Sequence, residues 1–102
     1  MNWIDAAPVA ALADGQTVSI AVGRTMIAVA RSGDEYFAIE DICTHDGADL
    51  TGGAIEGTEI ICPRHGARFC LRTGEAMTPP AYEPVRVFET KVADGRVWVR
   101  AD

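Results

Sequence analysis

The segment CTHDGADLTGGAIEGTEIICPRHG, residues 43–66, contains both histidines of the chain and two of its three cysteines. They fall into two short groups, Cys43-Thr44-His45 and Cys62-Pro63-Arg64-His65, with sixteen residues between His45 and Cys62. Each group offers one thiolate and one imidazole, and both are donors that bind transition metals. Because such matched groups are improbable by chance, the segment predicts a metal centre built from two loops.

Strand patterns surround this segment on both sides. β-Branched and aromatic residues alternate with polar ones, or stand in short apolar runs between turn residues, which predicts strands over residues 17–22, 25–30, 36–39, 59–62, 68–71, 85–92 and 96–100. Ala93-Asp94-Gly95 is the expected turn of a terminal hairpin. A helical turn is expected only near residues 8–13. The pattern predicts an all-β fold, a small antiparallel sandwich or barrel.

Two stretches depart from this strand pattern. Residues 41–58 are rich in Gly, Thr and acidic residues and show no strand pattern, and residues 77–84 contain three of the five prolines. Long irregular loops on a compact β scaffold usually carry the function. We therefore expect both stretches to take part in the metal centre.

The composition limits the class of protein. A chain of 102 residues fits a single domain, 1–102, and 48% hydrophobic residues exclude a disordered tail. No membrane-spanning run is present, and a formal charge of −6 argues against binding to nucleic acid or to anionic lipid. The N-terminus shows no signal-peptide pattern, so a cytoplasmic protein is expected. Disulfides are rare there, and the count of three cysteines is odd.

The donor types alone leave three kinds of metal site open. A structural zinc site uses two Cys and two His, but its usual spacing separates thiols from imidazoles, whereas here each group is mixed. A blue-copper site needs two His, one Cys and a weak axial ligand, which the paired groups do not suggest. A 2Fe–2S centre with two thiolates on one iron and two imidazoles on the other is satisfied by one Cys and one His from each loop.

The motifs Cys43-x-His45 and Cys62-Pro63-x-His65-Gly66 strongly resemble the two cluster loops of Rieske proteins, and Pro79-Pro80-Ala81 resembles the proline loop that covers the cluster there. The resemblance covers essentially the whole chain. It implies one Rieske-type 2Fe–2S cluster, with Cys43 and Cys62 on the inner iron and His45 and His65 on the outer iron. Gly47 and Gly66 are expected to permit tight turns after the ligands.

The resemblance also implies a function. The length is similar to that of stand-alone Rieske ferredoxins, which are not enzymes themselves. Such a protein is a soluble, monomeric electron carrier that docks transiently with two partners. It passes single electrons from a flavoprotein reductase using NAD(P)H to a terminal non-haem iron oxygenase acting on aromatic compounds. The alternatives are a nitrite-reductase small subunit, a Rieske protein associated with iron–sulfur assembly, and, from another class, a colourless structural zinc module.

Departures from the high-potential Rieske branch predict a low potential. That branch joins its cluster loops by a disulfide, at positions where this chain has Ala48 and Arg64. It also uses Ser and Tyr hydroxyls as donors where this chain has Ala67 and Phe69. Fewer donors stabilise the reduced cluster less, so we expect a potential near the lower end of the Rieske range, roughly −150 mV.

Charge and the third cysteine complete the sequence interpretation. Residues 32–62 contain eight acidic and no basic residues, whereas residues 63–100 contain seven basic and four acidic residues. This predicts either a surface of local ion pairs or an acidic face that steers a basic partner. Cys70 has no role in the resemblance, and we expect it to be a small buried side chain in a strand.

Overall fold

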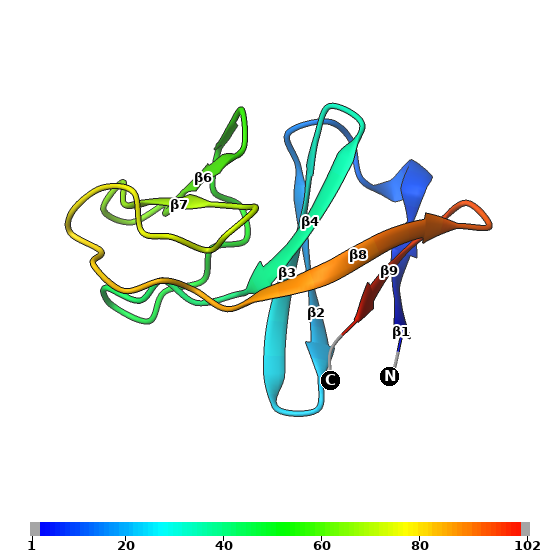
Figure 1. The fold of residues 1–102 in the computed structure, drawn as a ribbon, viewed down its shortest axis with the longest axis horizontal. Helices are drawn as coiled ribbons and strands as arrows, with labels where there is room; N and C mark the ends of the chain where they lie inside the picture. Colours follow the sequence, from blue (N-terminus) through cyan, green and yellow to red (C-terminus); the bar gives the residue numbers. More distant parts are fainter. Residues whose placement is uncertain (1–2, 101–102) are drawn as a thin grey trace.

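Nine strands form two antiparallel sheets in the computed structural model, which describes residues 3–100 (Figure 1). The larger sheet has the strand order β1-β9-β8-β4-β3-β2, and the smaller has the order β5-β6-β7. The strands are β1 (Trp3–Pro8), β2 (Thr17–Val22), β3 (Thr25–Ser32), β4 (Glu35–Glu40), β5 (Ile55–Glu56), β6 (Glu59–Ile61), β7 (Arg68–Cys70), β8 (Val87–Ala93) and β9 (Arg96–Arg100). The predicted all-β, antiparallel fold class is confirmed.

Most of the predicted strands are present, and two strands were missed. The predicted ranges 17–22 and 96–100 match β2 and β9. β1 was missed because Asp5-Ala6-Ala7 has weak strand propensity, and its pairing with β9 supplies the conformation. The prediction that residues 41–58 contain no strand was wrong at Ile55–Glu56, which forms β5 and pairs with β6. The expected helical turn is a 3-10 helix of three residues, Val9–Ala11.

The terminal hairpin has the expected tight turn. Ala93 pairs with Arg96, which leaves a two-residue loop at Asp94-Gly95. Both loop residues have positive φ, 55° and 72°, as a type I′ turn requires. Residues 3–100 contain no helix long and apolar enough to cross a membrane.

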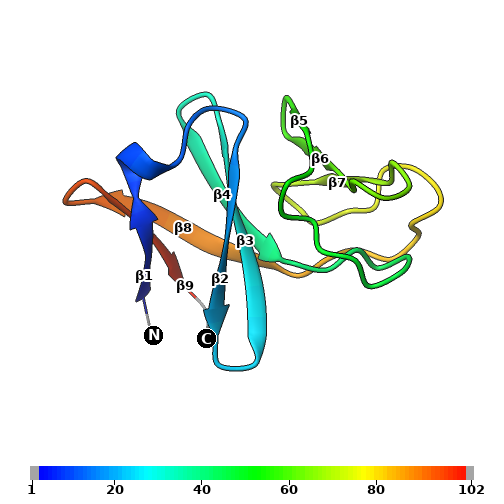
Figure 2. The ribbon, with the colours of Figure 1, turned by 180° about the vertical axis from the view of Figure 1, so that it is seen from behind.

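Strands β3 and β4 separate two hydrophobic cores. Side chains of successive strand residues point to opposite faces. Ile27 and Val29 of β3 therefore join one core with Val97 and Val99 of β9, whereas Ala28 and Ala30 face the other. The second core lies between the larger sheet and a small lobe, residues 41–86, that contains the three-stranded sheet and projects to one side in both views (Figures 1 and 2).

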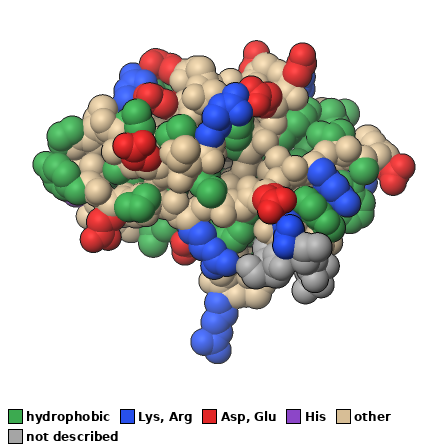
Figure 3. Space-filling model, in the orientation of Figure 1, with side chains coloured by type: hydrophobic (Ala, Val, Ile, Leu, Met, Phe, Trp, Pro, Cys, Tyr) green, Lys and Arg blue, Asp and Glu red, His purple; other side chains and the backbone are tan. Residues whose placement is uncertain are grey.

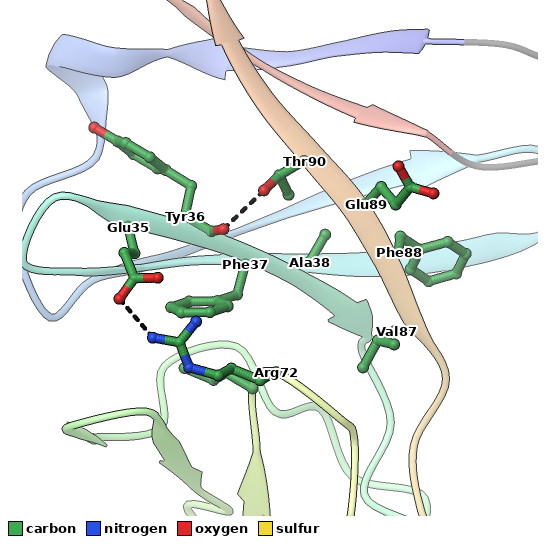
Figure 4. Close-up of a pocket in the computed structure, with 10 residues that line it drawn as sticks. Glu35, Tyr36, Phe37, Ala38, Arg72, Val87, Phe88, Glu89 and Thr90 are labelled. Carbon is green, nitrogen blue, oxygen red and sulfur yellow. Dashed lines mark hydrogen bonds and ion pairs between the residues drawn. The ribbon is translucent and has the colours of Figure 1, made fainter.

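The small lobe is attached to the larger sheet by polar contacts as well as by its core. Arg72, just after β7, reaches the groove between β4 and β8 (Figure 4). Its guanidinium lies 5.3 Å from the ring centre of Phe37 and 2.6 Å from a carboxylate oxygen of Glu35, both in β4. The Ser32 hydroxyl donates to the carbonyl of Gly57 at 2.5 Å. These contacts fix the position of the lobe that carries both cysteine–histidine groups.

Candidate metal centre

The two predicted ligand loops share one backbone geometry. In the first, the N–H of Cys43 donates to the carbonyl of Ala48 at 2.7 Å, and the N–H of Gly47 donates to the carbonyl of Cys43 at 2.8 Å. The second loop repeats both bonds from Cys62, at 2.7 and 3.1 Å. Gly47 and Gly66 have φ of 79° and 77°, the left-handed region that the turn needs and that glycine adopts without strain. The expected role of both glycines in tight turns agrees with this geometry.

A third loop with the same geometry was missed by the sequence interpretation. The N–H of Cys70 donates to the carbonyl of Glu75 at 2.9 Å, and the N–H of Gly74 donates to the carbonyl of Cys70 at 2.7 Å. The signal was available in the sequence, because Cys-x-x-x-Gly occurs at all three cysteines. Cys70 does not join the donor groups formed by the other two cysteines within the described residues. The turn alone therefore does not define the candidate centre.

The structure brings the four predicted ligands together and sorts them by type. Cys43 and Cys62 are buried, each 1% exposed, whereas His45 and His65 are exposed. The two imidazole rings meet edge to face with their centres 5.2 Å apart. In the described residues the donor atoms form two groups, the thiols with Asp46 and the imidazoles with Asp46, each with its atoms within 4.8 Å of one another.

This arrangement fits a two-iron centre. A tetrahedral zinc ion needs all four donors around one point. Here the thiols form an inner group and the imidazoles an outer one, as a 2Fe–2S centre with mixed ligands requires. Cys43 and Cys62 would bind the buried iron, and His45 and His65 the iron nearer the surface.

Burial changes the acidity of the free Cys43 thiol. It raises the pKa of Cys43, and the neighbouring Cys62 raises it further, while backbone N–H groups of His45 and Asp46 directed at the sulfur oppose the shift. These N–H groups are the donors that a metal-bound thiolate uses. Metal binding would release the thiol protons, so loading of the site depends on pH.

Asp46 is a residue of the centre that the sequence interpretation did not single out. Its Oδ1 accepts the N–H of Ala48 at 3.0 Å, and its Oδ2 lies 3.4 Å from Nε2 of His65. The Ala48 hydrogen bond lowers the pKa of Asp46, and the Arg64 guanidinium and the two nearby imidazoles lower it further. The carboxylate is thus charged at neutral pH and lies against both ligand loops.

A buried carboxylate anchors the start of the first loop. Asp41 accepts backbone N–H bonds from Leu50 and Thr51 at 2.7 and 2.8 Å. It also accepts the hydroxyls of Thr51 and Ser19 at 2.7 and 2.9 Å. Ser19 belongs to β2, so this network ties the loop to the larger sheet. Nothing in the sequence pattern distinguished Asp41 from its acidic neighbours.

The proline-rich stretch, residues 77–84, lies against the first ligand loop. The hydroxyl of Thr44 donates to the carbonyl of Glu83 at 2.7 Å. Ala81 is buried in the core that contains both thiols, whereas the adjacent Tyr82 is 81% exposed. The segment thus contacts the first ligand loop, as the resemblance implied, and carries an exposed aromatic side chain.

Cys70 differs from its predicted environment. It ends β7 and is only partly buried. A hydrogen bond from the Thr73 side chain, helped by the backbone N–H groups of Thr73 and Arg72, lowers the pKa of the Cys70 thiol despite the burial. The expectation of a simple buried side chain was therefore wrong, because the turn after β7 directs donors at the sulfur.

Comparison with known proteins places this geometry in a family. Residues 2–89 match the family described as the Rieske 2Fe–2S domain. The ferredoxin component of naphthalene 1,2-dioxygenase/salicylate 5-hydroxylase systems from Ralstonia sp. is 34% identical over 99% of this chain and 97% of its own length. Ferredoxin CarAc of Metapseudomonas resinovorans is 42% identical over 79% of this chain and 76% of its own length.

Solved structures agree. The ferredoxin of carbazole 1,9a-dioxygenase from Nocardioides aromaticivorans IC177 superposes with a TM-score of 0.93 at 30% identity, covering all of both chains. A chain from the complex of reduced oxygenase and oxidised ferredoxin in carbazole 1,9a-dioxygenase gives a TM-score of 0.89 at 37% identity over 95% of this chain and 91% of that one. The predicted resemblance is confirmed, and the chain belongs to the Rieske 2Fe–2S family.

Proposed function

We propose that this chain is the ferredoxin component of a multicomponent aromatic-ring dioxygenase system, a single-electron carrier and not itself an enzyme. The observation that carries the proposal is the sorting of the donors, with buried thiols and exposed imidazoles, in a chain that matches such ferredoxins over nearly its whole length. One 2Fe–2S cluster, when bound, accepts and releases one electron.

The four donor residues have different tasks in this proposal. Cys43 and Cys62, buried in the core, would hold the inner iron and keep it away from water. His45 and His65 would hold the outer iron at the surface, where a partner can approach the ring edges. Imidazole ligands contribute less negative charge than thiolates, so the centre would favour an added electron on the histidine side, nearer the partner. The four residues would therefore both hold the cluster and direct the electron toward the partner.

The partners follow from the same proposal. A flavoprotein reductase using NAD(P)H supplies the electron, and a terminal non-haem iron oxygenase receives it. The carbazole dioxygenase complex of oxygenase and ferredoxin supports the second partner. We further propose that the chain acts as a cytoplasmic monomer made of one domain, residues 1–102. Size-exclusion chromatography with light scattering tests the monomer, and limited proteolysis tests the single domain.

Anaerobic purification followed by EPR tests the cluster. A red-brown protein with a Rieske-type signal after reduction is expected, and a colourless zinc protein would refute the proposal. Cys43→Ser, Cys62→Ser, His45→Ala and His65→Ala should each lose the signal, whereas Cys70→Ser is the matched control and should keep it. Reconstitution with candidate reductases, oxygenases and a sirohaem nitrite reductase subunit then identifies the partners.

A further inference from the structure

The two ligand loops contact each other through a pair of charged side chains that are not among the four predicted ligands. Asp46 lies in the first loop, and its Oδ2 is 3.6 Å from Nε of Arg64 in the second. The same oxygen is 3.4 Å from Nε2 of His65, also in the second loop. Oδ1 accepts the N–H of Ala48 in its own loop at 3.0 Å. One carboxylate therefore shapes the first loop and reaches across to the second.

We propose that the Asp46–Arg64 ion pair is a clamp that holds the two ligand loops together and slows loss of the metal centre. The proposal rests on the proposed function, since it takes these loops as the cluster loops. All three cysteines are free, so no disulfide joins the loops. The ring contact of His45 and His65 also joins them, but those rings are themselves donors. The Asp46–Arg64 ion pair joins the loops through two side chains that are not among the four predicted ligands.

The size of the effect follows from exposure. The Arg64 side chain is 64% exposed and that of Asp46 20%, so water and salt screen part of their attraction. Exposed ion pairs stabilise a protein only weakly, so losing this one is expected to change a rate or equilibrium constant by about two- to five-fold. The clamp is therefore expected to slow loss of the centre measurably and not to decide whether it forms.

The rate of loss of visible absorbance from the holoprotein in excess chelator tests the clamp. Asp46→Asn and Arg64→Gln should each accelerate the loss by about two- to five-fold, and the double variant should be no faster than either single one. High salt should remove the advantage of the wild-type protein.

An ion pair away from the ligand loops supplies the control. Asp5 in β1 and Arg96 in β9 are 2.6 Å apart and about 40% exposed, so Asp5→Asn removes a comparable surface pair of the larger sheet and should leave the rate unchanged. Asp46→Glu keeps the charge and should restore most of the rate.

Two results would overturn the clamp: single variants that lose absorbance at the wild-type rate, or a double variant whose acceleration equals the product of the two single effects. If a variant does not load, thermal unfolding of the four apoproteins of the double-mutant cycle replaces the rate, and zero coupling between positions 46 and 64 overturns the clamp. A colourless wild-type protein would instead refute the proposed function, and the apoprotein cycle would still decide on the clamp.

Discussion

At the level of single residues, Asp41 is a buried acidic side chain: it is 6% exposed, and its carboxylate accepts four hydrogen bonds. Asp41→Asn replaces one acceptor oxygen by a donor group facing other donors. We expect a loss of about 2–3 kcal/mol in the free energy of unfolding of the apoprotein. Asp14→Asn is the control, since Asp14 is exposed and, among residues 3–100, accepts one hydrogen bond, from the N–H of Gly33. This change should cost less than about 0.5 kcal/mol.

Asp41 also predicts a pH dependence of stability. Burial raises its pKa, but the hydrogen bonds from Thr51, Ser19 and Leu50 outweigh this, so the folded-state pKa lies below the ordinary value. The stabilisation is therefore fully present above the unfolded-state pKa, about 3.9, and is lost as pH falls through the lower folded-state value. Unfolding of the apoprotein measured from pH 6 downward should show this loss below about pH 4, and Asp41→Asn should flatten it. Equal slopes for the two proteins would contradict the assignment.

Two buried apolar residues after the second ligand loop make the potential adjustable. Ala67 and Phe69 are both fully buried and have no side-chain group that can donate to the centre. Ala67→Ser and Phe69→Tyr each add a hydroxyl there. A hydrogen bond that stabilises the reduced form by about 1.4 kcal/mol raises a one-electron potential by about 60 mV. Redox titration should show a rise from the expected value near roughly −150 mV, and a clearly positive wild-type potential would refute the low-potential assignment.

At the level of loops and strands, the small lobe depends on close backbone contacts. A Cβ on Gly53 would lie 2.2 Å from the carbonyl oxygen of Ile61, so Gly53→Ala must displace backbone between the two ligand loops. We expect it to cost about 2–3 kcal/mol and to weaken metal loading. Gly57 is the matched control, because its φ is 59° but no atom lies within 4 Å of its Cβ position. Gly57→Ala should cost about 1 kcal/mol by thermal unfolding, and equal costs would contradict the steric argument.

The same elements show which features of this structure can be predicted from sequence. The strands with alternating residues and the four donors were predictable, because their signals are local. β1 and β5 were not, because their pairing with β9 and β6 supplies what their own residues lack. Cys70 begins a turn of the same kind as those at the two proposed ligand cysteines. Only the tertiary structure shows that it lies outside the donor groups that those two form. Contacts across loops, such as Asp46 with Arg64, leave no pattern in the sequence.

For the whole molecule, folding rearranges the charge separation seen along the chain. Four of the eight acidic residues in 32–62 contact arginines of the basic segment: Glu35 with Arg72, Asp46 with Arg64, and Glu56 and Glu59 with Arg68. Asp41 is buried, and its carboxylate is hydrogen-bonded within the protein. On the face seen in Figure 3, acidic and basic side chains are interspersed. Local pairing therefore explains much of the asymmetry, and steering of a partner depends on the net charge of −6.

An exposed aromatic side chain on the segment that contacts the first ligand loop is then the stronger basis for docking. Tyr82 is 81% exposed, and its neighbours hold it in place, because Ala81 is buried and the carbonyl of Glu83 accepts the Thr44 hydroxyl next to His45. A rigid aromatic side chain presented in this way loses little conformational entropy on binding and is typical of residues that dominate interfaces. Tyr82→Ala should therefore raise the KM for the ferredoxin in reduction of an oxygenase that the wild-type protein serves by about ten-fold.

The controls separate docking from folding and from general surface effects. Val92→Ala removes a side chain that is 53% exposed, from the end of β8 opposite the small lobe (Figure 1), and should leave the KM unchanged. The reduction potential and EPR signal of Tyr82→Ala should match the wild type, since the ring is not a ligand. Added salt should lower the partner reduction rate of both variants alike if net charge steers the encounter. Equal KM values for Tyr82→Ala and Val92→Ala would show that docking does not use this ring.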